Sequence, residues 1–267
     1  MEEVQTVLAL PVICTRGMIV FPHNDLTLDV GRRKSLRAIE DAMNTYDGNL
    51  IFVSQTNPVD EDPGFDGVYH VGTLCKIKKR IRRDSQGTIK LTVTGIDRVE
   101  LTSMDVVNGC LYAQATVLND VTGDTNEELA LVRRVTENME TLAAAVPSLP
   151  RDVRMALAKG VPAYRLADTI AQYLPLTLEK KQNFLETVSV NDRLMMIITE
   201  MEQEKVITDI EQNINRKVRE SIDENQKEFY LREKLRAIKE ELGDAPNRED
   251  DSDSLREKIE NNPYPEH

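Results

Sequence analysis

Residues 71–95 have the sequence VGTLCKIKKRIRRDSQGTIKLTVTG, and this stretch decides the fold of the first part of the chain. Ile89, Leu91 and Val93 alternate with lysine and threonine, the pattern of a strand with one buried and one wet face. The run before it, 71–83, is joined to it by Asp-Ser-Gln-Gly, polar turn residues that include a glycine. The stretch therefore predicts a β-hairpin.

Apolar runs elsewhere in the first 118 residues predict further strands. These strands cover 7–13, 26–30, 50–54 and 111–118. One helix is predicted after Gly31, because Leu36, Ile39 and Met43 recur at helical spacing and would lie on one face against the sheet. We predict a small, mostly β domain over 1–118 with one embedded helix, whose core holds Cys14, Cys75 and Cys110.

The part of the chain that follows is predicted to be helical. The polar segment 119–126 contains Gly123, and Thr-Asn-Glu-Glu at 125–128 has the pattern of a capping box, so we place a linker there. Prolines and glycines punctuate 127–189, which predicts a bundle of short helices. The chain is therefore expected to have the α+β fold class.

One very long helix is predicted over 190–243. Residues 190–242 contain neither proline nor glycine, a second capping box begins at Ser189, and Gly243 stands where the helix would stop. Such a helix would be about 80 Å long, far beyond the roughly three turns of an average globular helix. Much of it is expected to project or to find a partner. An acidic linker is predicted over 244–267.

Apolar residues along this helix predict helix–helix assembly. They follow one another at three- and four-residue spacing along one seam, which a mostly charged stretch at 217–228 interrupts and which is expected to resume at Leu231. Val218 and Ile222 in that interruption lie one position off the heptad register, so a continuous coiled coil is not expected. The candidate assembly residues are Ile207, Ile210, Ile214, Leu231, Leu235 and Ile238.

Composition and motifs exclude several kinds of chemistry. The formal net charge of −12 opposes general binding to nucleic acid, and the three cysteines form no CxxC pair. The sequence contains no Gly-Lys dipeptide for a P-loop, no HExxH among its three histidines and no GxSxG elbow. His23, beside a proline, is interpreted as structural. We predict no catalytic, cofactor-binding or metal-binding residue.

Several segments resemble the Lon protease family. They are LPV at 10–12, FPH at 21–23, VGRRKSLRAIEDAM at 30–43, LADTIAQYLPLTLEKKQ at 166–182 and QKEFYLREKLRAIKEELG at 226–243. The resemblance implies a PUA-like pseudobarrel, then a helical bundle and a long helix. It also implies that a longer protein carries an AAA+ ATPase using ATP and Mg²⁺ and a Ser-Lys dyad peptidase, none of whose residues map onto this sequence.

The resemblance implies a non-catalytic region that binds misfolded, damaged or short-lived proteins and supports a homohexamer. Met18, Ile19 and Phe21 are the candidate substrate-binding residues, with core packing as their alternative role. Glu2 and Glu3 stand where a signal peptide needs positive charge, and no run reaches the roughly 20 apolar residues of a membrane span. We therefore expect a cytoplasmic protein without membrane partners.

Residues 76–83 depart from that family by being more basic than expected there. Two interpretations stay open: a solvated strand face with Ile77 and Ile81 turned to the core, or a site for DNA, polyphosphate or acidic substrate segments. The second would make the chain a regulatory nucleic-acid or polyphosphate binder, and a third class is a purely structural spacer. The candidate anion-binding residues are Lys76, Lys78, Lys79, Arg80, Arg82 and Arg83.

Overall fold

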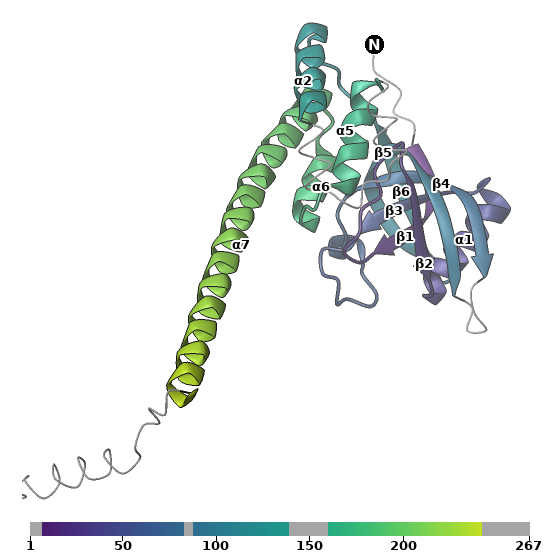
Figure 1. Cartoon of the computed structure of the whole chain (residues 1–267). Helices are drawn as coiled ribbons and strands as arrows, with labels where there is room; N and C mark the ends of the chain where they lie inside the picture. Colours follow the sequence, from purple (N-terminus) through teal and green to yellow (C-terminus); the bar gives the residue numbers. More distant parts are fainter. Residues whose placement is uncertain (1–6, 83–87, 139–159, 242–267) are drawn as a thin grey trace, which may run out of the picture. The chain divides into compact units, whose positions relative to one another are not determined.

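The computed structural model describes residues 7–82, 88–138 and 160–241 (Figure 1). The chain divides into two compact units, Met1–Val206 and Ile207–His267. The first contains the sheet, the short helices and the beginning of the long helix, and the second contains the rest of that helix. The predicted linker at 244–267, Gly243 and Arg83 lie outside the described residues. The mixed α+β class is confirmed.

Six strands form one sheet in the first unit. Their order is β2-β5-β4-β3-β1-β6, and an additional pairing of β5 with β6 closes five of them into a ring. Among these six described strands, β1 and β3 pair in parallel and the other pairs are antiparallel. The strands are β1 (Val7–Thr15), β2 (Asp25–Val30), β3 (Asn49–Ser54), β4 (Val71–Arg82), β5 (Ile89–Val107) and β6 (Cys110–Leu118), with a short 3-10 helix η1 (Phe65–Gly67) between β3 and β4.

The predicted hairpin is the pair β4 and β5, but a bulge changes which side chains of β4 face the core. Before the bulge Ile77 pairs with Val93, and both are buried. The register shifts between Ile77 and Lys79, after which Ile81 pairs with the exposed Lys90. Ile81 is therefore 44% exposed, and the expectation that it turns to the core was wrong because the extra residue shifts the alternation by one.

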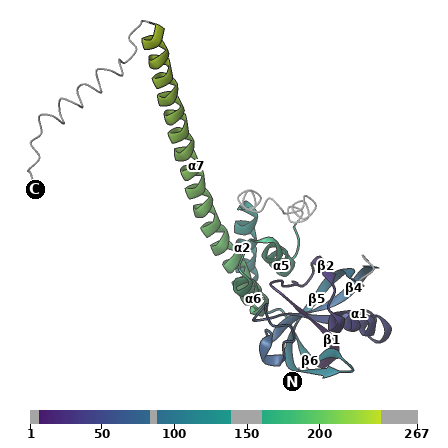
Figure 2. The ribbon, with the colours of Figure 1, turned by 90° about the horizontal axis from the view of Figure 1, so that it is seen from below.

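The helix predicted after Gly31 is α1 (Arg33–Thr45), and it packs on the sheet core (Figure 2). Ile39 is buried as expected and Leu36 is partly buried against the same core. Met43 is 47% exposed, which corrects its predicted place on the buried face. The buried face instead consists of Ser35 and two alanines beside Ile39, since small side chains let the helix approach the sheet closely.

All three cysteines are buried in the sheet core, as predicted. Burial raises the pKa of Cys14 to about 12, and burial together with the Asp41 carboxylate raises that of Cys110 to about 11. Burial also raises the pKa of the Cys75 thiol. Thiols in this state are poor nucleophiles at neutral pH.

We expect iodoacetamide at pH 8 to alkylate all three thiols at least about tenfold more slowly in the native chain than in guanidinium chloride. Mass spectrometry of quenched samples measures the rates for each cysteine. A cysteine that reacts equally fast in both conditions would show that its part of the core is open.

Gly95 lies where the chain before β2 crosses β5. His23 N donates to Gly95 O and Gly95 N donates to Asn24 O, both at 2.9 Å. A Cβ at Gly95 would lie 2.3 Å from the carbonyl oxygen of Phe21, which is backbone and cannot swing away. The position therefore requires glycine.

Replacing Gly95 with alanine is expected to lower the free energy of unfolding by about 2 kcal/mol, because the two backbones must separate. Gly64→Ala is the matched control, since a Cβ there meets no atom within 4 Å. Guanidinium unfolding followed by circular dichroism compares the two variants. Equal stability of both would contradict the close approach.

Helices pack beside the sheet in the first unit (Figure 2). They are α2 (Thr125–Glu137), α5 (Ala163–Tyr173), α6 (Leu178–Glu186) and the first turns of α7 (Val190–Glu241). The α2 cap differs from the prediction, because Asp124 accepts from the backbone N–H groups of Asn126 and Glu127 in place of Thr125. The Ser189 cap is confirmed, since its Oγ accepts from Asp192 N at 3.2 Å.

The long helix α7 is continuous over 52 residues. One face of its first turns is buried as far as Met201, and every described residue from Asp209 to Glu241 is exposed. Within the described residues, no helix combines the length and the apolar character that crossing a bilayer requires. The continuity of α7 confirms the predicted long helix.

Candidate functional site

A cluster of four charged side chains, three of them buried, joins the sheet to the helices. Arg98 of β5 and Arg193 of α7 both bind the Asp168 carboxylate of α5, and both also reach Asp120. Arg193 lies 2.5 Å from Asp168 and 2.6 Å from Asp120. Arg98 Nε donates to the carbonyl of Leu185 at 3.0 Å. Asp168 is fully buried and both arginines are at most 2% exposed, so this cluster fixes the helices on the sheet.

The loop after β1 packs into the hydrophobic core of the helices. Ile19 and Phe21 are 4% and 0% exposed and pack in the helical core, and Phe21 N donates to Gln172 Oε1 at 3.2 Å. These two side chains therefore cannot offer exposed apolar surface to a substrate, and their candidate role was wrong. They fill the space between sheet and helices, which is the alternative role considered for them. Met18 is 36% exposed and remains a candidate substrate-binding residue.

Met18 lies at a cavity of about 580 Å³ that we name the β1–β2 cleft. Its walls are the end of β1, the strand β2 and the beginning of α1. A neighbouring cavity of about 490 Å³ shares Cys14, Arg16, Arg32 and Ser35 with it. Further lining of the cleft comes from Ile13, Thr15, Met18, Thr27, Leu28, Asp29, Val30, Gly31 and Lys90.

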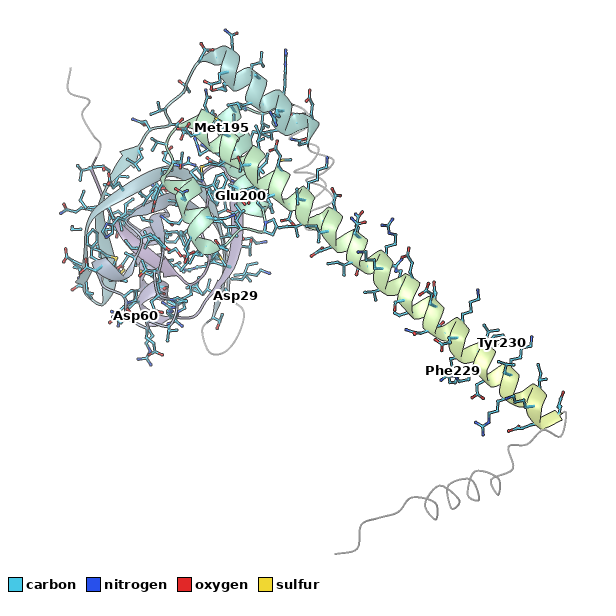
Figure 3. All side chains as sticks on the ribbon, turned by 90° about the vertical axis from the view of Figure 1, so that its left-hand side faces the viewer. Asp29, Asp60, Met195, Glu200, Phe229 and Tyr230 are labelled. Carbon is cyan, nitrogen blue, oxygen red and sulfur yellow. The ribbon has the colours of Figure 1, made fainter. Side chains whose placement is uncertain are left out.

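Two arginines of the cleft are held in place by neutral oxygen atoms. Arg16 Nη2 donates to the carbonyl of Asp60 at 3.0 Å, and Arg32 Nη1 donates to Gln55 Oε1 at 3.0 Å. Gln55 is fully buried and also donates to the Asp60 carbonyl at 2.8 Å. Figure 3 labels Asp60 and Asp29 on this part of the unit. These contacts orient both guanidinium groups without neutralising them, which leaves them able to bind a carboxylate.

The basic strand is partly neutralised. Lys76 pairs with Asp47 at 2.5 Å, and Lys78 with Asp25 at 2.8 Å. Burial opposes ionisation of Asp25, but hydrogen bonds from Lys78 and Thr94 outweigh it and lower the pKa of that carboxyl.

Lys79 and Arg80 are exposed on the same strand. Because of the bulge they do not continue the alternation that precedes it. The side chain of Arg82 lies outside the described part of the chain, as does Arg83.

The candidate assembly residues all lie exposed on α7. At about 100° per residue, Ile207, Ile210 and Ile214 form one stripe, and Val218 and Ile222 continue it. Ile207, Val218 and Phe229 are eleven residues apart, a repeat that suits a straight or slightly right-handed helix pairing better than a heptad coiled coil. Figure 3 labels Phe229 on this helix. The exposed fractions of Ile207, Ile210, Ile214, Val218 and Ile222 are 49%, 52%, 54%, 49% and 49%.

Leu231, Leu235 and Ile238 form a second stripe. In the continuous helix they lie about 110° around the axis from the first stripe. The prediction that they resume the same seam was wrong, because seventeen residues from Ile214 to Leu231 do not make a whole number of helical turns. The two stripes therefore face different directions and form two separate apolar surfaces.

Comparisons with known proteins show which family and which relatives this chain resembles. Residues 9–203 match the family described as ATP-dependent protease La (LON) substrate-binding domain. The Lon protease of Brevibacillus choshinensis is 32% identical over 96% of the chain and 33% of that protein, and the Lon protease of Escherichia coli K12 is 33% identical over 94% and 32%. The chain thus spans about a third of the length of the curated relatives it matches.

Solved structures show the same fold. The N-terminal domain of Mycobacterium avium complex Lon protease superposes with a TM-score of 0.59 at 21% identity, over 73% of this chain and 98% of that one. A Lon N-terminal domain protein from Xanthomonas campestris has a TM-score of 0.50 at 16% identity, over 72% and 98%. At these identities the likeness supports the fold of the sheet and short helices.

Proposed function

The chain belongs to the Lon protease family, where it matches the substrate-binding domain, and from this we propose that it receives unfolded or damaged polypeptides for an ATP-dependent serine protease. The observation that carries the proposal is the extent of the family match, residues 9–203, which takes in the sheet, the short helices and the buried turns of α7. The chain supplies binding, and the ATPase with its ATP and Mg²⁺ and the peptidase belong to other parts of a longer cytoplasmic protein.

The β1–β2 cleft supports the binding role. It combines an exposed thioether, apolar lining from Leu28 and Val30, and cations at Arg16, Arg32 and Lys90. Unfolded polypeptides expose apolar side chains that folded proteins bury, so a partly apolar cleft distinguishes the two. A flexible methionine at the rim suits cargo of varied sequence.

The first stripe of α7 supports an assembly role. Its isoleucines and valine are about half exposed, a state that leaves apolar area free for a partner helix. In a homohexamer, the partner of such a stripe is an apolar surface of another copy of the chain. Assembly of copies would bring several clefts to one protease and raise the effective affinity for a long unfolded chain.

Photocrosslinking tests the binding role. A reduced and carboxymethylated polypeptide carrying a photoactivatable group is mixed with the chain, irradiated and digested, and the labelled residues are located by mass spectrometry. We expect label within 9–203, competed by other denatured polypeptides and not by the same polypeptide in its folded form. A chain that serves only as a spacer would remain unlabelled.

The same photocrosslinking experiment, combined with a binding assay for DNA and polyphosphate, distinguishes the nucleic-acid hypothesis from substrate binding. A regulator acting through 76–82 would bind DNA or polyphosphate with a steep dependence on salt. Changing Lys78 and Lys79 to glutamate would then abolish that binding. Substrate binding in the β1–β2 cleft predicts that this double variant retains its crosslinks to denatured polypeptide.

A further inference from the structure

The ring of strands has an opening between β1 and β2. β2 pairs with β5 along one side and stands at the end of the strand order. β1 pairs with β6 only through 7–11, while 12–15 pair with β3 on the other side. In the described part of the chain, therefore, one edge of β2 and one edge of the end of β1 have no neighbouring strand. Residues from both edges line the β1–β2 cleft.

An unpaired strand edge carries backbone groups that need hydrogen-bond partners. Alternate residues of an edge strand point their N–H and C=O groups away from the sheet, where water or another strand must satisfy them. Natural proteins usually cover such an edge or blunt it with charge. In this chain the edge of β2 borders a cavity of about 580 Å³, a size typical of ligand sites.

We propose that the β1–β2 cleft binds an extended segment of unfolded polypeptide by strand addition, with the main chain of the segment pairing along the free edge of β2. This inference rests on the proposed substrate-binding function and deepens it by naming how the substrate is held. β2 has six residues, so the paired segment is about 20 Å long.

Main-chain pairing explains how one cleft can accept unrelated sequences. All unfolded polypeptides share the same backbone donors and acceptors, whereas a folded protein has already paired its strands. An edge therefore selects for the unfolded state without requiring a sequence motif. Side chains then adjust affinity through the cleft walls.

The lining predicts which segments bind best. Along β2, Leu26 and Leu28 turn inward toward the sheet core and Thr27 turns outward. An added strand alternates in the same way, so alternate side chains meet apolar lining and the others lie near the rim. The cleft lining carries more positive than negative charge, because it has three cations, Arg16, Arg32 and Lys90, and one carboxylate, Asp29. Segments that alternate apolar and acidic residues are therefore favoured over basic ones.

N-methylated peptides test the pairing directly. The probe is a fluorescent eight-residue peptide of alternating leucine and glutamate, and its binding to the full chain is followed by anisotropy. Two further versions carry N-methyl groups on the odd or on the even amides, and each version therefore loses the donors of one edge. Strand addition predicts that one version binds at least about tenfold more weakly while the other stays within about threefold of the parent, because only one edge faces β2.

Variants of the chain provide an independent reading. Lys90→Glu is expected to weaken binding of the leucine–glutamate peptide several-fold and to strengthen binding of a leucine–lysine peptide. Lys227→Glu is the matched control, because it makes the same change of net charge in the other unit. Equal effects of the two variants, or equal affinity of both N-methylated peptides, would overturn strand addition.

The two proposals fail in different ways. If the chain binds a reduced and carboxymethylated polypeptide but both N-methylated peptides match the parent, strand addition is wrong and substrate binding stands. If the chain binds no denatured polypeptide at all, the proposed function is wrong and strand addition falls with it.

Discussion

Replacing Asp168 with asparagine is expected to lower the free energy of unfolding of the first unit by about 3–5 kcal/mol. The Asp168 carboxylate is fully buried and binds two guanidinium groups that are themselves at most 2% exposed. Asparagine preserves the shape and removes the charge, which leaves the buried guanidinium groups of Arg98 and Arg193 to share the single carboxylate of Asp120. Guanidinium unfolding followed by circular dichroism measures the loss.

Asp47→Asn is the control for that experiment. Asp47 pairs with Lys76, but its side chain is 93% exposed, so water screens the pair. We expect this variant to change stability by less than about 1 kcal/mol. The two variants remove the same formal charge, and a similar loss from both would show that the buried cluster does not hold the helices on the sheet.

Replacing Ile210 and Ile214 together with aspartate is expected to weaken self-association of the chain at least about 100-fold, because two carboxylates would enter an apolar interface. Sedimentation equilibrium over a range of concentrations measures the effect. The unfolding of the first unit should not change, since both positions lie beyond its boundary at Val206.

A matched variant checks that the loss comes from the stripe and not from added charge. Gln212→Asp combined with Gln226→Asp adds the same two charges on another face of α7. This control should associate like the parent chain. If it dissociates equally, or if the Ile210 and Ile214 variant associates normally, the first stripe is not the assembly surface.

Local sequence patterns predicted most of the secondary structure. The alternation of Ile89, Leu91 and Val93 and the polar turn before it located the hairpin, since strand period and turn chemistry are properties of neighbouring residues. The absence of proline and glycine over 190–242 predicted α7 in the same way. Helix and strand positions were therefore predictable to within a few residues.

Contacts between distant residues were not predictable in this way. Arg98 and Asp168 are 70 positions apart, and no periodic pattern marks either as a partner of the other. The β4 bulge depends on how β5 pairs and is invisible in the β4 sequence, where Ile77 and Ile81 fit a regular alternation. Ile19 and Phe21 looked available for a substrate because only the packed helices reveal that they are covered.

The opening between β1 and β2 was likewise not predictable from local sequence patterns. It exists because β6 covers only 7–11 of β1 and because β2 follows β5 at the end of the sheet, and both facts are topological. The basic residues at 76–83 attracted attention in the sequence, yet two of them face carboxylates. The cations of the cleft, Arg16, Arg32 and Lys90, are scattered along the chain and gave no such signal.

Hydrogen–deuterium exchange with and without a saturating denatured polypeptide tests the central claim most directly. The account predicts slower exchange of the amides in 25–30 and around Met18, with little change in the basic strand at 76–82. Unchanged exchange in 25–30, with protection confined to another surface, would contradict it.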